Sequence, residues 1–118
     1  NVALVTLAMD DSALLIDAVT PDHYAGAVIA TMGAGHVPSH LLDAIGALAS
    51  RLPCVFVSRT GNGEVHRHSC DFAGSELRLI ERGVIPGGSF DPLKARIMLR
   101  LLLAAGASRD EIFSTFRE

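Results

Sequence analysis

The residues of this chain best suited to acid–base or metal chemistry are its histidines, His23, His36, His40, His66 and His68. His36 and His40 stand four residues apart, a spacing that can place two imidazoles on one face of a helix. A zinc-binding helix of the H-E-x-x-H type carries a glutamate between its histidines, but the intervening stretch here is V-P-S. His66 and His68 alternate on an expected extended segment near Cys70, which fits a solvated polar edge better than a metal cluster. The sequence therefore predicts no metal site.

A glycine-rich loop, G-A-G-H-V-P-S at residues 33–39, is the second candidate for chemistry. Gly33 and Gly35 permit a sharp turn and a close approach of the backbone to a ligand. The helix expected after the loop could offer its free N–H groups to an anion. A dinucleotide-binding loop of the G-x-G-x-x-G type needs a third glycine, and Pro38 occupies that position. On the residues alone, the glycines simply turn the chain, and His36 caps the helix or faces solvent.

A second loop, S-R-T-G-N-G-E-V at residues 58–65, offers a hydroxyl group but no catalytic set. Ser58 ends an apolar run and is a conceivable nucleophile. It lacks the G-x-S-x-G context that exposes the nucleophilic serine of α/β-hydrolases, so we interpret it as a polar residue at a strand end. Taken by themselves, the residues predict a ligand-facing edge without a complete catalytic constellation.

Both loops follow apolar runs that read as buried strands, so a sheet must position them. Strands are expected over residues 2–7, 25–32 and 54–58, with a short fourth strand within 84–89. Helices are expected over residues 12–19, from 37 onward, 75–81, 91–105 and 108–116. This alternation predicts an α/β fold, a small open parallel sheet of about four strands flanked by helices. In such sheets ligand groups gather at the carboxyl ends of the strands, where both loops begin.

Two helix starts carry clear sequence signals. Asp91 is followed by a proline, which combines a capping carboxylate with the residue favoured at the first helical position. Ser108 and Glu111 have the spacing of a capping box. Between these starts, Arg96 and Arg100 are expected to form an exposed pair. This pair flanks an apolar stripe made of Leu93, Ile97 and Leu101.

Composition limits the class of protein. With 118 residues, 49% of them hydrophobic, the chain fits one domain over residues 1–118. A net charge of −3 and a pI near 5.9 argue against a broad nucleic-acid-binding surface. The most apolar stretch, residues 97–107, is about half the length of a membrane span, so no membrane partner is expected. Because Asn1 rather than Met opens the chain without a signal peptide, we expect a fragment or a processed chain, located in the cytoplasm.

The two cysteines do not form a disulfide framework. Cys54 lies in the run C-V-F-V and is expected to be a small buried hydrophobic residue. Cys70 lies in a polar stretch, and a Cys54–Cys70 disulfide is the less favoured alternative.

Three motifs, in order, carry a family resemblance: the two loops above and the helix start F-D-P-L-K-A-R. With them the chain resembles, over nearly its whole length, the C-terminal domain of bacterial L-asparaginases of the asparaginase/glutaminase family. The resemblance implies a two-domain enzyme that hydrolyses L-asparagine to L-aspartate and ammonia through a threonine nucleophile, with no metal or other cofactor. In the family, the nucleophilic threonine lies in a T-G-G-T stretch of an N-terminal domain, where a second threonine acts with Asp and Lys partners, the Asp in a T-D-T stretch. Neither stretch occurs here. This chain therefore supplies no catalytic residue, and alone it is expected to be inactive.

The resemblance also implies roles for loop residues. A residue of the glycine-rich loop, Asn or Ser in well-known members, reaches the active site of a neighbouring subunit, and His36 occupies that position. An acidic residue after the second loop lies near the amino group of the substrate, and Asp71 and Glu76 are both candidates. For Glu76, a carboxylate at a helix N-terminus is the simpler interpretation. The remaining matched positions are expected to shape the loops or the interface: Gly33, Gly35, Ser58 and Arg59.

The implied partners are the protein's own N-terminal domain, a second subunit of a homo-oligomer and a small amide substrate, with no nucleic acid or membrane. One alternative is a stand-alone, non-enzymatic module of the same fold that binds a small or regulatory ligand. Another keeps the two-domain enzyme but changes the substrate to glutamine or a different amide.

Overall fold

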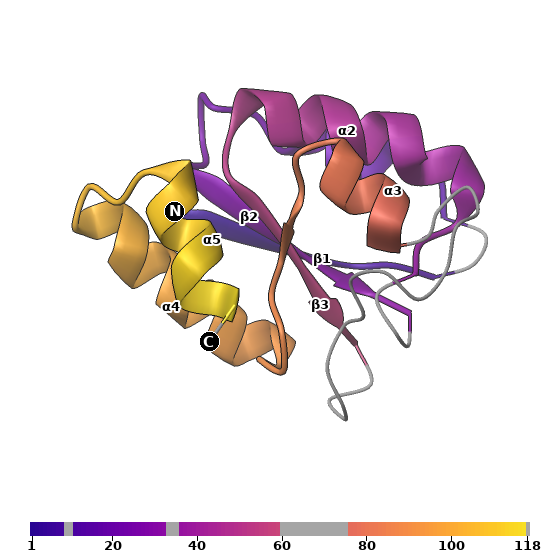
Figure 1. Ribbon diagram of the computed structural model, residues 1–118. Helices are drawn as coiled ribbons and strands as arrows, with labels where there is room; N and C mark the ends of the chain where they lie inside the picture. The colour runs from indigo at the N-terminus through magenta and orange to yellow at the C-terminus, as the bar shows by residue number, and fades with distance from the viewer. Residues whose placement is uncertain (9–10, 33–35, 60–75, 118) are drawn as a thin grey trace.

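The computed structural model describes residues 1–8, 11–32, 36–59 and 76–117, without the side chain of Glu76. Within these ranges, four parallel strands form one sheet in the order β1-β2-β3-β4. The strands are β1 (Val2–Thr6), β2 (Gly26–Thr31), β3 (Cys54–Ser58) and β4 (Ile85–Pro86) (Figure 1). The predicted α/β fold with a small parallel sheet is confirmed. All strands point the same way, so their carboxyl ends meet at one edge of the sheet.

Helices cover both faces of this sheet. On one face lie α1 (Leu14–Ala18), α2 (Leu42–Arg51), entered through the short 3-10 helix η2 (Ser39–Leu41), and α3 (Glu76–Glu81). On the other face lie α4 (Pro92–Ala104) and α5 (Arg109–Arg117) (Figure 1). This layering explains why β2 and β3 read as continuous apolar runs, because every residue of both strands is buried.

Alternation along the strands divides the core into two clusters. Ile29 and Phe56 pack with Leu48 on the side of α2, whereas Val28 and Val55 pack on the opposite side. Leu99 of α4 and Phe116 of α5 complete the second cluster, and the Phe116 ring meets that of Phe90 at a centroid distance of 5.1 Å. Since neighbouring strand residues point to opposite faces, one short sheet fills both clusters.

The two predicted helix caps are confirmed. Asp91 Oδ1 accepts a 2.8 Å hydrogen bond from the backbone N–H of Lys94. At α5, Ser108 N–H donates to Glu111 Oε1 at 3.0 Å, and Glu111 N–H donates to Ser108 Oγ at 3.2 Å. Hydrogen bonds to the Glu111 carboxylate from the Ser108 backbone N–H and, to a lesser extent, from the Ser108 hydroxyl lower the pKa of Glu111, because they favour its charged form.

Two expectations on the helices need correction. The first helix begins at Leu14 rather than residue 12, no side chain caps it, and Asp11 accepts a hydrogen bond from the Ala8 N–H instead. Arg96 is not fully exposed, because its Nε donates to the Val2 carbonyl at 2.8 Å and the side chain lies against β1. The apolar stripe beside it faces solvent, with Leu93, Ile97 and Leu101 being 57–67% exposed. None of the described helices is both long and apolar enough to cross a membrane.

Candidate functional site

The carboxyl ends of β1, β2 and β3 form the candidate site, and hydrogen bonds tie these ends to one another. Leu7 N–H donates to Ala30 O at 3.0 Å, and Arg59 N–H donates to Thr31 O at 2.7 Å. The buried hydroxyl of Thr31 donates to the Val57 carbonyl at 2.9 Å. These bonds continue the pairing past the strand ends, so the loops leave from a fixed base.

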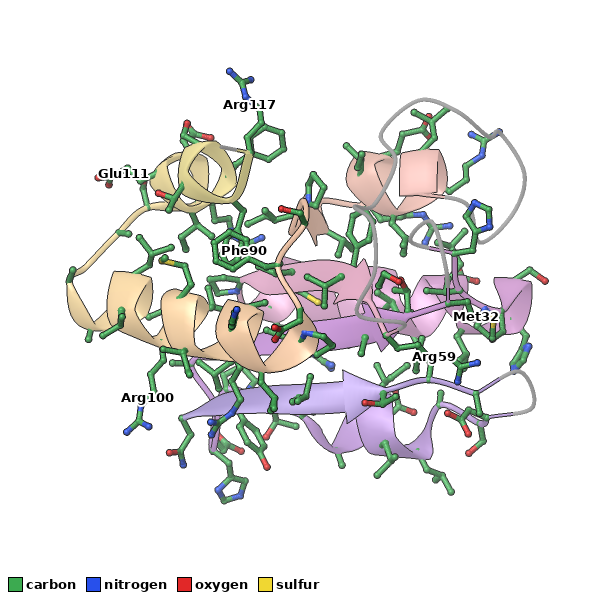
Figure 2. All side chains as sticks on the ribbon, turned by 90° about the horizontal axis from the view of Figure 1, so that it is seen from below. Met32, Arg59, Phe90, Arg100, Glu111 and Arg117 are labelled. Carbon is green, nitrogen blue, oxygen red and sulfur yellow. The ribbon has the colours of Figure 1, made fainter. Side chains whose placement is uncertain are left out.

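Arg59 adds a longer connection. It follows β3 directly, yet its Nη1 donates to the carbonyl of Leu7, 52 residues earlier, at 2.8 Å. Leu7 follows β1, and β2 lies between β1 and β3, so the side chain crosses the end of the middle strand. Figure 2 shows Arg59 and Met32 at the same end of the sheet. Arg59 therefore holds three strand ends together at the point where the glycine-rich loop begins.

The glycine-rich loop is closed by main-chain pairing around its tip. Met32 N–H donates to His36 O at 2.9 Å, and the two residues form an isolated antiparallel bridge. The turn between them lies outside the described residues. His36 is half-buried and precedes the 3-10 helix, so it does not share a helix face with His40. The bridge fixes the backbone of His36 beside the end of β2.

His40 has a structural contact that the sequence did not indicate. Its Nε2 lies 2.6 Å from the carbonyl oxygen of Asp11. A carbonyl can only accept, so Nε2 carries the proton and donates. The Asp11 carboxylate in turn accepts from Ala8 N–H at 2.8 Å. His40 therefore joins the segment after β1 to the start of η2, at the same edge of the sheet.

The structure brings three of the predicted site residues together: His36, Ser58 and Arg59 all lie at the carboxyl edge. Ser58 is only 5% exposed, which agrees with a strand-end residue rather than a presented nucleophile. Gly33, Gly35 and Asp71 lie outside the described residues. Glu76 is the first residue of α3, and its side chain lies outside the described part as well.

Metal and thiol chemistry find no support among the described residues. Within these ranges, no group of three or more His, Cys, Asp or Glu side chains could hold a metal ion. His66, His68 and Cys70 lie outside them. Cys54 is a free, buried thiol, as its apolar run predicted, and burial raises its pKa to about 12. Such a thiol stays protonated and unreactive at neutral pH.

Comparison with known proteins gives consistent matches. The family described as "Glutaminase/Asparaginase C-terminal domain" matches residues 1–116. A Deinococcus radiodurans protein named "Probable L-asparaginase" is 38% identical over 93 residues, covering 79% of this chain and 28% of that protein. An L-asparaginase of Bacillus licheniformis is 33% identical over 105 residues, covering 88% of this chain and 32% of that protein.

The fold has a matching solved structure. The thermostable L-asparaginase from Thermococcus kodakarensis superimposes with a TM-score of 0.85 at 26% identity, over 100% of this chain and 36% of that one. The chain thus spans only 28–36% of the length of these three proteins.

Proposed function

The chain belongs to the glutaminase/asparaginase C-terminal domain family, and from this premise we propose that it is the C-terminal domain of a longer L-asparaginase. The full-length protein would hydrolyse L-asparagine to L-aspartate and ammonia. The observation that carries the proposal is the family match over residues 1–116, together with relatives that are named L-asparaginase and extend far beyond the matched region. The nucleophile, and with it the catalytic step, belongs to the remainder of the protein, so the chain alone is inactive.

The domain's part in the reaction is to present groups to the substrate from its carboxyl edge. His36 is the first of these groups, because the bridge to Met32 fixes its backbone at this edge. An imidazole can donate a hydrogen bond to the carboxylate of an amino-acid substrate, more strongly when protonated. Asp71 or Glu76 supplies the negative charge near the substrate's amino group.

The edge itself is shaped by residues that do not touch the substrate. The family resemblance implies a loop-shaping role for Gly33 and Gly35, while Ser58 ends β3 and Arg59 follows it at the start of the second loop. Arg59 supports this role with its bond to Leu7 O. The partners of the edge are the protein's own N-terminal domain and a second subunit of a homo-oligomer.

The test uses the full-length protein and an ammonia-release assay with L-asparagine and L-glutamine. His36→Ala should lower kcat/KM for asparagine about tenfold, the effect of one lost hydrogen bond to a charged group. His23→Ala is the matched control, because His23 is an exposed histidine in the turn before β2, and it should leave kcat/KM within about twofold. Unchanged kinetics for His36→Ala would contradict its role. A full-length protein that releases no ammonia from either amide would overturn the L-asparaginase assignment and favour a different amide substrate or a non-enzymatic binding module.

A further inference from the structure

The outer edge of β1 carries main-chain groups that the sheet does not use. Ala25 N–H donates to Asn1 O, and Leu7 N–H donates to Ala30 O, so the odd-numbered residues of this segment face β2. Successive residues of a strand direct their N–H and C=O groups to opposite sides. The N–H and C=O groups of Val2, Leu4 and Thr6 therefore point away from the sheet. Among the described residues, only Arg96 bonds to this edge, at the Val2 carbonyl.

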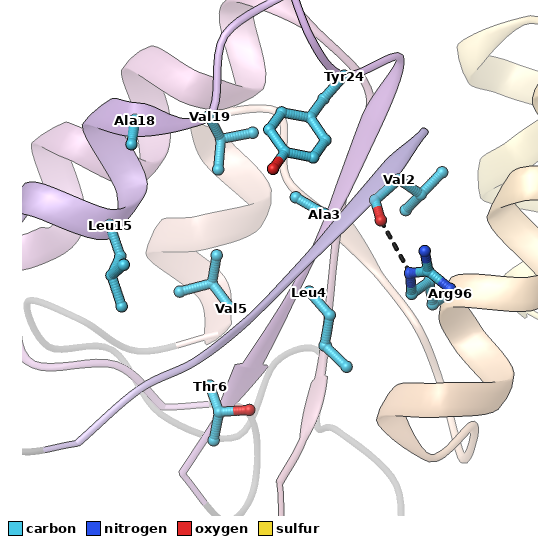
Figure 3. A pocket seen from close by; sticks show the side chains of 10 residues that line it. All are labelled: Val2, Ala3, Leu4, Val5, Thr6, Leu15, Ala18, Val19, Tyr24 and Arg96. Carbon is cyan, nitrogen blue, oxygen red and sulfur yellow. Dashed lines mark hydrogen bonds between the residues drawn. The ribbon is translucent and has the colours of Figure 1, made fainter.

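A hollow runs along this free edge. It has a volume of about 410 Å³, and all five residues of β1 line it. One wall is apolar and comes from α1 and the turn before β2, with Leu15, Val19 and Tyr24; Leu15 is 64% exposed. The other wall is Arg96 of α4 (Figure 3). A second hollow of about 250 Å³ continues past Val2 and is lined by Arg100.

Apart from the Arg96 contact at Val2, the described residues give this edge none of the following protections against pairing with another strand. Protected edge strands carry lysine, proline or a bulge, or are covered by another segment. β1 reads V-A-L-V-T, with no charge and no proline, and its pairing with β2 runs without interruption. A strand of this kind is suited to strand addition, in which main-chain bonds give affinity and pockets beside them give specificity.

The positive charge beside the edge indicates the chemistry of the segment that would bind there. Both hollows contain an arginine, and no carboxylate is among the described residues that line them. The ion pairs found among the described residues involve Arg78, Arg82 and Lys94 rather than these two arginines. An occupant with an acidic side chain at this place would form charge-assisted hydrogen bonds.

Resting on the proposed function, we propose that the outer edge of β1 binds an extended segment of the same full-length polypeptide, from outside residues 1–118, with an acidic side chain against Arg96 and Arg100. A five-residue strand covers roughly 17 Å of such a segment. The relatives supply the length for it, since the chain spans 28–36% of them. A second copy of β1 fits less well, because it would bring the same two arginines and no carboxylate to the contact.

The test measures hydrogen exchange of single amides in the full-length protein. The Val5 N–H faces β2 and serves as the internal reference, whereas the Leu4 N–H faces outward. The proposal predicts that Leu4 exchanges within about tenfold of Val5, because both amides are bonded. A Leu4 amide that exchanges more than about a hundredfold faster than Val5 overturns the proposal.

Charge variants test the acidic side chain of the occupant. Arg100→Glu should raise the exchange rate of Leu4 at least about tenfold, and Arg100→Lys should keep most of the protection. Arg51→Glu, at the exposed end of α2, is the matched control and should leave the exchange rate of the Leu4 amide unchanged. Equal exchange in Arg100→Glu and Arg51→Glu, or protection that disappears when the protein is diluted to monomers, overturns the proposal.

An amidase assay on the same samples separates the two proposals. If the protein is active and its Leu4 amide exchanges fast, strand docking is wrong and the L-asparaginase proposal is kept. If the protein is inactive and its Leu4 amide is protected from exchange, strand docking is supported and the L-asparaginase proposal is overturned. Thr6→Pro gives an independent variant, since it removes an outward N–H and keeps the sheet bonds to β2. It should speed exchange at Leu4, and Thr6→Ala should not.

Discussion

The carboxyl ends of the strands and the outer edge of β1 differ in how many of their main-chain groups are hydrogen-bonded. At the carboxyl ends, the carbonyls of Leu7, Thr31 and Val57 each accept a bond from a residue of a neighbouring segment. Along the outer edge, Arg96 at the Val2 carbonyl is the one such contact among the described residues. The first region is built to hold loops in fixed positions, and the second keeps bonding capacity for a segment from elsewhere. Substitutions matched between regions can test this contrast.

The largest difference in the free energy of unfolding is expected between alanine substitutions at two glycines that lie at opposite ends of the strands. A Cβ on Gly87, beside the carboxyl end of β3, would lie 2.3 Å from Cγ1 of the buried Val57 and 3.0 Å from Phe56 O. A Cβ on Gly26 would lie 2.8 Å from Cδ1 of the half-buried Leu103, a flexible side-chain end, and 3.2 Å from both Cδ2 of the buried Leu99 and the Pro53 carbonyl oxygen, which need to give by only a few tenths of an ångström. Gly87→Ala should therefore cost roughly 3 kcal/mol in the free energy of unfolding, and Gly26→Ala about 1 kcal/mol. Urea denaturation measures both, and equal losses would mean that the carboxyl ends are not the tighter region.

The next effect concerns activity of the full-length protein. Arg59→Met removes the bond to Leu7 O and should lower kcat/KM about tenfold, because the loop with His36 loses part of its base. Arg59→Lys should recover part of this loss, since an ammonium group can donate to the same carbonyl. Arg51→Met removes an exposed arginine far from that edge and should have no effect. If Arg59→Met and Arg51→Met had the same kcat/KM, the bond would matter for stability alone.

Two threonines give a smaller and more direct contrast. Thr31 is fully buried and its hydroxyl donates to Val57 O, whereas Thr6 is exposed on the free edge. Thr31→Val should destabilise the protein by roughly 1 kcal/mol through the lost hydrogen bond. Thr6→Val should stay within about 0.5 kcal/mol of the parent, as surface substitutions do. Thermal denaturation of the pair checks the ranking, and a costlier Thr6→Val would reverse it.

The smallest expected effect depends on pH and lies outside both regions. The pKa of Glu111 is lowered from 4.5 by its hydrogen bonds to Ser108. Because the folded-state pKa is depressed, this group stabilises the fold above pH 4.5, and the contribution is lost as pH falls through the folded-state pKa. Glu111→Gln removes the carboxylate and should flatten this part of the profile of melting temperature against pH, whereas Ser108→Ala keeps the backbone N–H, loses only the hydroxyl and should flatten it partly. The difference in melting temperature between Thr31→Val and Thr6→Val should not change across the same pH range. A change would show that the capping box is coupled to the two regions.

The sequence predicts the elements better than it predicts their contacts. Continuous apolar runs indicated β2 and β3 because helices cover both faces of the sheet, and Asp91 marked the start of α4 through its local cap. The bonds from Arg59 to Leu7, from His40 to Asp11 and from Arg96 to Val2 join residues 52, 29 and 94 positions apart. Side-chain bonds to a distant main chain leave no periodic pattern in a sequence.

The candidate site divides in the same way. Strand order and direction suffice to place His36, Ser58 and Arg59 at one edge of the sheet, because parallel strands share their carboxyl ends. Their roles do not follow from that placement. The groups that would complete a reaction are absent from this sequence, so the roles come from the family resemblance and remain predictions.

The strand order also bears on how the chain folds while it is being synthesised. Each strand lies beside the one that precedes it in the sequence, so a nascent chain can add strands in the order in which they leave the ribosome. The face that carries Val28, Val55 and Val57 stays bare during this growth, because α4 and α5, which cover it, are made after all four strands. A translation product stopped before Pro92 would expose that face as one apolar patch, which is the kind of surface that chaperones bind.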